Sequence, residues 1–390
     1  MSAMPEREPP YVFDLSPEEL TDTLSAFGFQ KFRARQVLEW VYRKGVADPQ
    51  QMSNLARADR ETLAQHLTFT KGQVLRSQTA TDGVQKLLLQ WPPGSPPLEV
   101  SPPEVSLSEV SSTPASQALP LAPTPDPRRQ TECVMIPELD GGTRRTACIS
   151  SQIGCPVGCK FCASGLGGLD GNLSAGQIVE QVWRLARLPD VGRISNVVFM
   201  GMGEPLSNFN AVTRAVRTLM ADWGMGISGR RITISTVGLP AQIKRLADLA
   251  LPVTLAISLH APNDAVRQRI IPWAEFVRIE QIIDAGRYYF TQTGREVTLE
   301  YILLGGVNDQ PDHARELARV ARTLRSNVNL IRYNEVQPLP FARPADRDVL
   351  RFQQILRDAG VNTHIRASRG RDIAAACGQL RHEMKDEGEG

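Results

Sequence analysis

Residues 150–165 read SSQIGCPVGCKFCASG, and this stretch holds three cysteines, Cys155, Cys159 and Cys162. Three thiolates at this spacing can hold three irons of a [4Fe–4S] cluster. Because iron–sulfur clusters usually take four cysteines, a set of three leaves one iron open to a ligand that is not part of the protein. An iron that a substrate can coordinate is a reaction centre, whereas a fully ligated cluster mainly carries electrons.

Zinc and disulfide formation are the alternatives for these cysteines. A structural zinc site needs a second Cys-x2-Cys pair or a Cys/His pair, and the nearest histidine downstream is His260. A disulfide is less favoured, because nothing else marks the chain as secreted. The spacing therefore favours an iron–sulfur cluster over zinc.

The composition is that of an ordinary soluble protein, with 390 residues, 42% hydrophobic and 22% charged. The first residues, MSAMPEREPPYVFDL, contain no apolar core of a signal peptide or anchor, and no apolar run approaches the roughly 20 residues of a spanning helix. We expect a cytoplasmic protein without a membrane partner. The net charge of +2 says little about nucleic acid by itself.

The N-terminal residues 1–70 are predicted to form a helical accessory domain. Ser16 and Pro17 are a typical helix start, and apolar residues follow at helical spacing. Basic clusters such as Lys31, Arg33 and Arg35 are expected on its outer faces. Their charge pattern alone is ambiguous, since solvated helix faces look the same.

A β-hairpin linker is predicted over residues 71–144, with a turn at Asp82-Gly83. An insertion at about 92–129 interrupts this hairpin. The run from Pro92 to Pro127 holds 11 prolines and no aromatic residue, so it cannot bury a core and we expect it to be disordered.

The remaining residues, 145–390, alternate strand-like and helical patterns, which predicts a parallel sheet with helical crossovers. The predicted strands are 146–150, 196–200, 231–237, 253–259, 296–304, 327–333 and 362–367. The predicted helices include 174–187, 241–250, 312–325 and 347–359.

Chemistry in such folds collects at the carboxyl ends of the strands. The cysteine loop follows the first predicted strand, and the Gly203-Glu204 pair follows the second. Further polar residues end the later strands, namely Ser235, Ser258, His260 and Asn334. This placement joins scattered polar residues into one candidate site.

The cysteine triplet and the β/α pattern resemble the radical S-adenosylmethionine enzymes, in which the open iron is chelated by S-adenosylmethionine. A partial (β/α)6-type barrel is the fold that this resemblance implies. Gly203-Glu204 fits the glycine-rich motif that holds the methionine ammonium in that superfamily.

Six motifs closely resemble the RlmN/Cfr family of adenine methyltransferases, which act on 23S ribosomal RNA. They are CISSQIGCPVGCKFC, VVFMGMGEPLSNFN, RRITISTVGLP, LAISLHAPND, NLIRYN and DIAAACGQL. The resemblance covers nearly all of the chain except the first dozen residues, the Pro-rich insertion and the last few positions.

The resemblance implies a [4Fe–4S] cluster and S-adenosylmethionine as cofactors, with roles for individual residues. The implied cluster ligands are Cys155, Cys159 and Cys162. The implied S-adenosylmethionine-binding residues are Gly203, Glu204, Ser235, Ser258, His260 and Asn334.

The family mechanism implies three more functional residues. Cys377 matches the cysteine that one S-adenosylmethionine methylates, after which a 5′-deoxyadenosyl radical from a second one takes hydrogen from that methyl group. Cys148 matches the cysteine that releases the methylated base by forming a disulfide with Cys377, and Glu132 matches an acidic residue of proton transfer. The sixth cysteine, Cys133, is interpreted as structural.

The resemblance also supplies partners, while the methylated position stays open. We expect 23S rRNA as substrate, tRNA as a second one, an electron donor such as flavodoxin or ferredoxin, and a monomer. Gly203-Glu204-Pro205 resembles the family members that methylate adenine C2, whereas Ile331-Arg332-Tyr333-Asn334 and the short tail resemble those that methylate C8. We favour C2. The alternative from another class is a non-catalytic RNA-binding protein with a metal or cluster.

Overall fold

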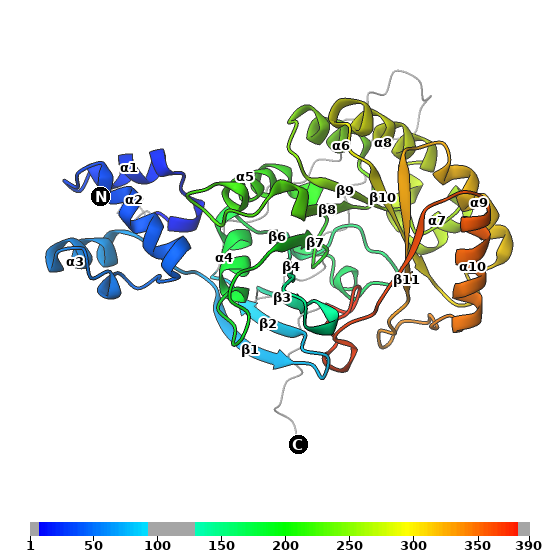
Figure 1. The fold of residues 1–390 in the computed structure, drawn as a ribbon, viewed down its shortest axis with the longest axis horizontal. Helices are drawn as coiled ribbons and strands as arrows, with labels where there is room; N and C mark the ends of the chain where they lie inside the picture. The colour runs from blue at the N-terminus through cyan, green and yellow to red at the C-terminus, as the bar shows by residue number, and fades with distance from the viewer. Residues whose placement is uncertain (1–7, 93–128, 381–390) are drawn as a thin grey trace, which may run out of the picture.

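The computed structural model describes residues 8–92 and 129–380, which form a helical N-terminal region, an antiparallel hairpin and an open barrel of parallel strands (Figure 1). The expected disorder of the Pro-rich run lies outside the described residues. No helix in the described ranges is long and apolar enough to cross a membrane.

Short helices make up the N-terminal region, which we call the N-terminal module (residues 11–69). The predicted start of its first α-helix is confirmed, because the Glu19 N–H donates to Ser16 Oγ over 3.2 Å and the Ser16 N–H donates to Glu19 Oε2 over 2.7 Å. The elements of the module are η1 Val12–Asp14, α1 Pro17–Ser25, α2 Phe32–Leu38, η2 Glu39–Lys44, η3 Pro49–Gln51 and α3 Arg57–His66.

One continuous sheet runs through the rest of the described chain, in the order β1-β2-β3-β4-β7-β8-β9-β10-β11-β12. Its antiparallel part is β1 Gln73–Thr79, β2 Gln85–Gln90 and β3 Gln130–Pro137, and Gln90 pairs with Gln130. The insertion therefore interrupts a hairpin, as predicted. Because β3 pairs antiparallel with β4 Arg145–Cys148, the hairpin extends the barrel sheet. The domain limits at 70 and 144 stay predictions.

Seven strands from β4 onward are parallel, and each predicted strand of the barrel is present within one or two residues of its expected ends. They are β4, β7 Asn196–Phe199, β8 Ile232–Thr236, β9 Thr254–Ser258, β10 Val297–Leu303, β11 Ser326–Arg332 and β12 Thr363–Arg366. The connecting helices are α4 Ala175–Leu185, α5 Phe209–Met220, α6 Pro240–Asp248, α7 Asp264–Ile270, α8 Ile279–Thr293, α9 Pro311–Ala321 and α10 Asp346–Asp358. The expected partial barrel is thus confirmed.

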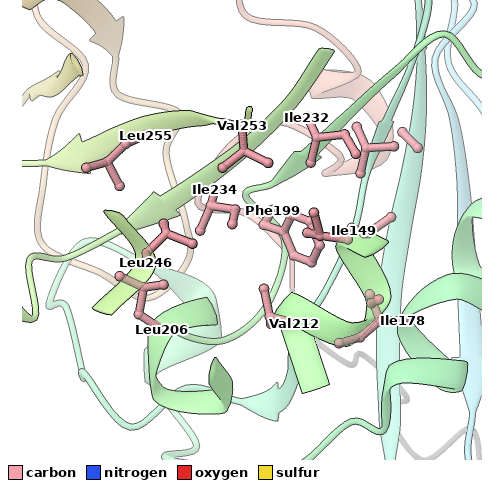
Figure 2. Packing of buried hydrophobic residues seen from close by; sticks show 14 of the residues in the cluster. Ile149, Ile178, Phe199, Leu206, Val212, Ile232, Ile234, Leu246, Val253 and Leu255 are labelled. Carbon is pink, nitrogen blue, oxygen red and sulfur yellow. The ribbon is translucent and has the colours of Figure 1, made fainter. Parts of the chain in front are cut away.

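The core lies between the strands and their covering helices (Figure 2). Phe199 of β7 and Ile234 of β8 are buried against Val212 of α5 and Leu246 of α6. Alternate strand residues face the helices, so their apolar side chains fix the sheet while the loops at the strand ends stay free to carry polar groups.

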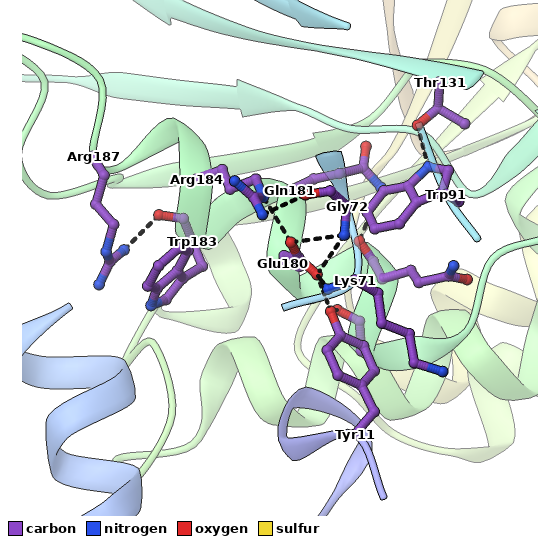
Figure 3. A network of polar contacts seen from close by, with 12 residues as sticks. Tyr11, Lys71, Gly72, Trp91, Thr131, Glu180, Gln181, Trp183, Arg184 and Arg187 are labelled. Carbon is purple, nitrogen blue, oxygen red and sulfur yellow. Dashed lines mark hydrogen bonds and ion pairs between the residues drawn. The ribbon is translucent and has the colours of Figure 1, made fainter. Parts of the chain in front are cut away.

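A polar network joins the N-terminal module to α4 (Figure 3). Glu180 of α4 is fully buried and accepts hydrogen bonds from the Tyr11 hydroxyl, the Lys71 N–H at 2.8 Å and the Gly72 N–H at 3.1 Å. Arg184 pairs with the same carboxylate at 2.6 Å. The module is therefore tied to the barrel at the helix that follows the cysteine loop.

Candidate active site

The cysteine loop is held by a small two-stranded sheet that the sequence pattern did not predict. Its strands are β5 Gln152–Gly154 and β6 Leu169–Asn172, which pair antiparallel. Gly154 has a φ of +73°, and a Cβ there would lie 2.0 Å from the Gly168 carbonyl oxygen, so only glycine fits. The Cys155 N–H donates to that same carbonyl at 2.8 Å. The strand pair thus fixes the base of the loop just before the first cysteine.

All three loop cysteines are free thiols, and they line a single cavity at the carboxyl ends of the barrel strands. Burial raises the pKa of Cys155, Cys159 and Cys162. Such thiols become thiolates when a cation stabilises the negative charge, as bound iron does. The donor set therefore fits an iron–sulfur cluster.

The arrangement does not fit a single metal ion. Within residues 8–92 and 129–380, no three His, Cys, Asp or Glu side chains converge on one metal position. A zinc ion needs such convergence, whereas the cysteines of a [4Fe–4S] cluster each bind a different iron and can stand further apart.

The expected S-adenosylmethionine residues mostly line the same cavity. Its lining includes Gly203, Glu204, Ser235, Ser258 and His260, together with the three loop cysteines and Cys377. These residues come from the ends of β7, β8 and β9, as the strand pattern predicted. The structure therefore brings these residues to one cavity although some of them lie more than 200 residues apart in the sequence, and their roles stay predictions.

Glu204 is the buried acid of this cavity. Its carboxylate accepts the Leu206 N–H at 2.9 Å and the Val237 N–H at 2.7 Å, and its own N–H donates to Gln152 Oε1 at 2.7 Å. Burial raises its pKa to about 7, against the lowering effect of those N–H groups. Gly203 has a φ of +98°, and a Cβ there would lie 2.6 Å from the Gln152 side chain. The glycine lets the turn pack closely and aims the carboxylate into the cavity.

His260 is held as a neutral imidazole. Its Nδ1 accepts the Ile302 N–H at 3.1 Å, and its ring meets Phe161 edge-on with the ring centroids 5.2 Å apart. Burial, and after it the nearby Arg267, lowers its pKa to about 3. His260 can therefore shape the cavity and donate a hydrogen bond, but it carries no charge at neutral pH.

The two serines and Asn334 take different places. Ser235 and Ser258, on neighbouring strands, share a hydrogen bond of 3.2 Å and both face the cavity. Asn334 is buried and is not among the residues that line it. Its Nδ2 donates to the Cys377 carbonyl at 3.4 Å, so in this structure it contacts the C-terminal cysteine loop.

Cys377 and Cys148 lie near each other beside the cavity. Cys377 is exposed in the loop after η9 Arg371–Ile373, and that loop binds the cluster loop because the Ala163 N–H donates to the Gly378 carbonyl at 2.8 Å. Cys148 is buried at the end of β4, in an apolar cluster with residues on both sides of Cys377 (Ala375 and Leu380). Burial raises the pKa of Cys148 to about 12, the Cys377 thiol adds to this rise, and Arg366 opposes it.

Glu132 lies on β3 and does not line the cavity. Its side chain is buried and forms an ion pair of 2.7 Å with Lys86 of β2. Cys133, interpreted as structural, is fully buried next to it in the main core.

Sequence reasoning missed several charged residues of the site. Arg267 is completely buried on α7 and donates to the carbonyls of Leu259 and Val237. Glu300 lines the cavity and lies 3.6 Å from Arg366 at the end of β12. A carboxylate inside the apolar run VTLEYILL was a signal for Glu300, whereas Arg267 stands in an ordinary helical pattern.

An open parallel barrel, a three-cysteine loop and a buried carboxylate after the next strand define a radical S-adenosylmethionine enzyme. The profile of the radical SAM superfamily matches residues 149–318. The profile of the ribosomal RNA large subunit methyltransferase N-terminal domain matches residues 12–69, which is the N-terminal module.

Relatives that match nearly the whole of this chain identify the family within that class. The chain is 38% identical over 372 residues to the probable dual-specificity RNA methyltransferase RlmN of Rhodopirellula baltica, covering 95% of this chain and 90% of that one. It is 41% identical over 367 residues to the protein of the same name from Thermosynechococcus vestitus, covering 94% and 96%. The crystal structure of a radical SAM methyltransferase from Sphaerobacter thermophilus superposes with a TM-score of 0.83 at 40% identity, covering 96% and 99%.

The chain therefore belongs to the RlmN family of radical S-adenosylmethionine RNA methyltransferases. Its cofactors are a [4Fe–4S] cluster and S-adenosylmethionine. The alternative of a non-catalytic RNA-binding protein is wrong, because the family consists of enzymes.

Proposed function

We propose that this enzyme methylates carbon 2 of an adenosine in 23S rRNA, through a methyl group carried on Cys377 and released by Cys148. One observation carries the proposal. Two cysteines outside the cluster loop lie at its cavity: Cys377 lines the cavity, and Cys148 belongs to an apolar cluster with Ala375 and Leu380, which stand on either side of Cys377 in the sequence.

The chemistry explains why two extra cysteines are needed. Adenine C2 is electron-poor, so the usual transfer of a methyl cation to a nucleophile cannot reach it, whereas a carbon radical can add to it. The cluster with bound S-adenosylmethionine supplies that radical chemistry when it is reduced. Cys155, Cys159 and Cys162 would hold the cluster, and Glu204 would accept the methionine ammonium.

In the proposed sequence, Cys377 Sγ first takes a methyl group and S-adenosylhomocysteine leaves. Loss of one hydrogen atom from this methyl leaves a thiomethylene radical on Cys377, which adds to the adenine carbon. The adduct then loses a proton, for which Glu132 is the proposed acceptor, and an electron, which the oxidised cluster would take up. Cys148 attacks Cys377 Sγ, the C–S bond breaks, the released carbon takes a proton, and a disulfide remains that needs two electrons for the next cycle.

The target base must leave its stack to reach Cys377. The basic residues of the N-terminal module, among them Arg35 and Lys44, are proposed to hold the RNA stem by its phosphates. We further propose tRNA as a second substrate, because relatives are named dual-specificity methyltransferases. A flavodoxin- or ferredoxin-type electron donor, a monomeric state and a cytoplasmic location complete the proposal.

Nucleoside mass spectrometry of treated rRNA tests the product. Ribosomal RNA that lacks the modification, incubated with cluster-loaded enzyme, S-adenosylmethionine and a reductant, should yield 2-methyladenosine. An 8-methyladenosine product would instead support the C8 alternative, for which the Ile331-Arg332-Tyr333-Asn334 motif is the sequence signal.

The cysteine roles are tested by substitution. Cys148→Ala should accumulate a covalent RNA–protein adduct, seen as a shifted band in a denaturing gel, because nothing breaks the C–S bond. Cys133→Ala is the matched control, a buried cysteine on the neighbouring strand, and should release methylated RNA. Cys377→Ala should abolish transfer with the cluster absorbance intact; methylated product from this variant would disprove the tether.

A further inference from the structure

Lys86 and Glu132 form a buried ion pair beside the site, and no role has been given to the lysine. The Lys86 Nζ lies 2.7 Å from Glu132 Oε1, and the two residues are 6% and 5% exposed. They stand on the neighbouring antiparallel strands β2 and β3, where Lys86 is opposite Val134 and Leu88 is opposite Glu132. The pair is thus a diagonal contact across one face of the hairpin.

Stability does not explain why this pair is present. Removing two charges from water costs free energy that a single ion pair often fails to recover, and apolar residues of similar size commonly do as well or better. The surroundings are apolar, since Val84 and Val134 belong to a buried cluster with Cys148. A hydrophobic pair would suit this position, so the charges indicate a functional requirement.

A second contact of Lys86 connects the pair to the catalytic loop. The Lys86 Nζ also lies within hydrogen-bond distance of the Ala374 carbonyl, at 3.3 Å, three residues before Cys377. The same segment is fixed again at the surface, where Asp82 accepts the Gly370 N–H at 2.9 Å and pairs with Arg369 at 2.8 Å. Lys86 is therefore the interior anchor of the segment, and it contacts the carboxylate and the cysteine loop with one ammonium group.

We propose that Lys86 is a positioning residue for the transfer step, holding the Glu132 carboxylate and the Cys377 loop in a fixed relation. The inference rests on the proposed function, in which Cys377 delivers the carbon and Glu132 takes the proton. Both groups must meet the same base atom, and a small displacement of either slows such a reaction strongly. An ammonium group suits this task because its three donors can serve a carboxylate and a carbonyl together.

The test distinguishes the methylation of Cys377 from the later methylation of RNA. Lys86→Met keeps the length of the side chain and removes its charge and donors; exposed Lys244→Met is the matched control. Intact mass after incubation with S-adenosylmethionine should reveal methyl-Cys377 in both proteins, and cluster absorbance should be normal in both. The kcat for RNA methylation should fall about 100-fold in Lys86→Met with the KM for RNA within about threefold, and stay unchanged in the control.

A double-mutant cycle tests whether Lys86 acts through Glu132. The combined loss in Lys86→Met with Glu132→Gln should be smaller than the sum of the two single losses, because without the carboxylate Lys86 has only the Cys377 loop left to position. Additive losses would overturn the proposal, as would a normal kcat for Lys86→Met. If Lys86→Met does not fold, Lys86→Leu with Glu132→Leu replaces the pair by apolar residues and should still fold, load methyl on Cys377 and methylate RNA slowly; a normal rate there would also overturn it.

Wild-type enzyme assayed in parallel distinguishes this inference from the proposed function. If wild-type enzyme gives no methyladenosine, or Cys377→Ala still transfers a methyl group, the proposed function fails. If wild-type enzyme behaves as proposed and Lys86→Met matches it, only the role of Lys86 fails.

Discussion

Two buried glutamates, Glu180 under the N-terminal module and Glu204 in the cavity, have opposite surroundings. Glu180 receives donors from the Tyr11 hydroxyl, two backbone N–H groups and the charged Arg184 (Figure 3). Glu204 receives two backbone N–H groups, and no ion pair to it is present in the described part of the chain. Glu180, which has its own cation, stabilises the fold, whereas Glu204, which has none, is the carboxylate that is proposed to bind the cation of a ligand.

The largest expected effect is the loss of stability on removing the Glu180 carboxylate, which has a complete set of hydrogen-bond and ion-pair partners. Glu180→Ala removes the carboxylate that Arg184 pairs with and leaves the Lys71 and Gly72 N–H groups without their acceptor, so the free energy of unfolding should fall by about 3–5 kcal/mol. Urea denaturation followed by tryptophan fluorescence measures this. The exposed Glu39→Ala is the control and should change stability by less than about 0.5 kcal/mol. A loss below about 1 kcal/mol in Glu180→Ala would mean that the network does not hold the module.

Substitution of the cavity glutamate, Glu204, should have the opposite effect: it should weaken ligand binding and leave stability nearly unchanged. Glu204→Gln keeps the shape of the side chain and one of its two hydrogen bonds from backbone N–H groups, but removes the charge that is proposed to face the methionine ammonium. The affinity of cluster-loaded protein for S-adenosylmethionine should fall about 100-fold, or about 2.7 kcal/mol, while the melting temperature changes little. Calorimetric titration measures this, with Glu180→Gln as the matched variant that should lose stability and keep its affinity. Equal affinity in Glu204→Gln and wild type would assign the ammonium to another group.

The contrast also shows what the sequence can predict. Strand ends were predictable because a parallel barrel brings them to one edge, so Ser235, Ser258 and His260 could be joined to the cysteine loop from the pattern alone. The role of Glu180 was not predictable, because a polar residue on an amphipathic helix is expected to face water. Here the N-terminal module covers that face of α4, and nothing in the local sequence of α4 states this.

Contacts between segments that lie far apart in the sequence explain the other features that the sequence did not predict. Lys86 meets Ala374 across 288 positions, and no periodicity within β2 indicates which loop will lie above it. The β5–β6 pair consists of three- and four-residue strands whose pairing depends on the closed cysteine loop rather than on strand propensity. Asn334 was placed correctly at a strand end, yet its side chain contacts the Cys377 loop because that loop folds over it.

The smallest expected effect, about tenfold in affinity per pH unit, tests the charge state of Glu204. Burial raises the pKa of its carboxyl from 4.5 to about 7, so below pH 7 a proton must leave before the carboxylate can pair with an ammonium. The affinity for S-adenosylmethionine should therefore fall as the pH drops from 7 to 5 and level off above 7. His260 adds no step, since its pKa of about 3 keeps it neutral over this window.

The raised pKa of Glu204 has the opposite effect on the stability of the protein without ligand, which should fall rather than rise with pH. A raised carboxyl pKa means that the folded state holds a proton which the unfolded chain releases above about pH 4.5, so the stability of the ligand-free protein should decrease between pH 4.5 and 7. In Glu204→Gln the contribution of this residue to both slopes should vanish, because the amide does not titrate. An affinity profile that is as steep in Glu204→Gln as in wild type would place the titrating group elsewhere, and Glu204 would then resemble Glu180 in having no part in ligand binding.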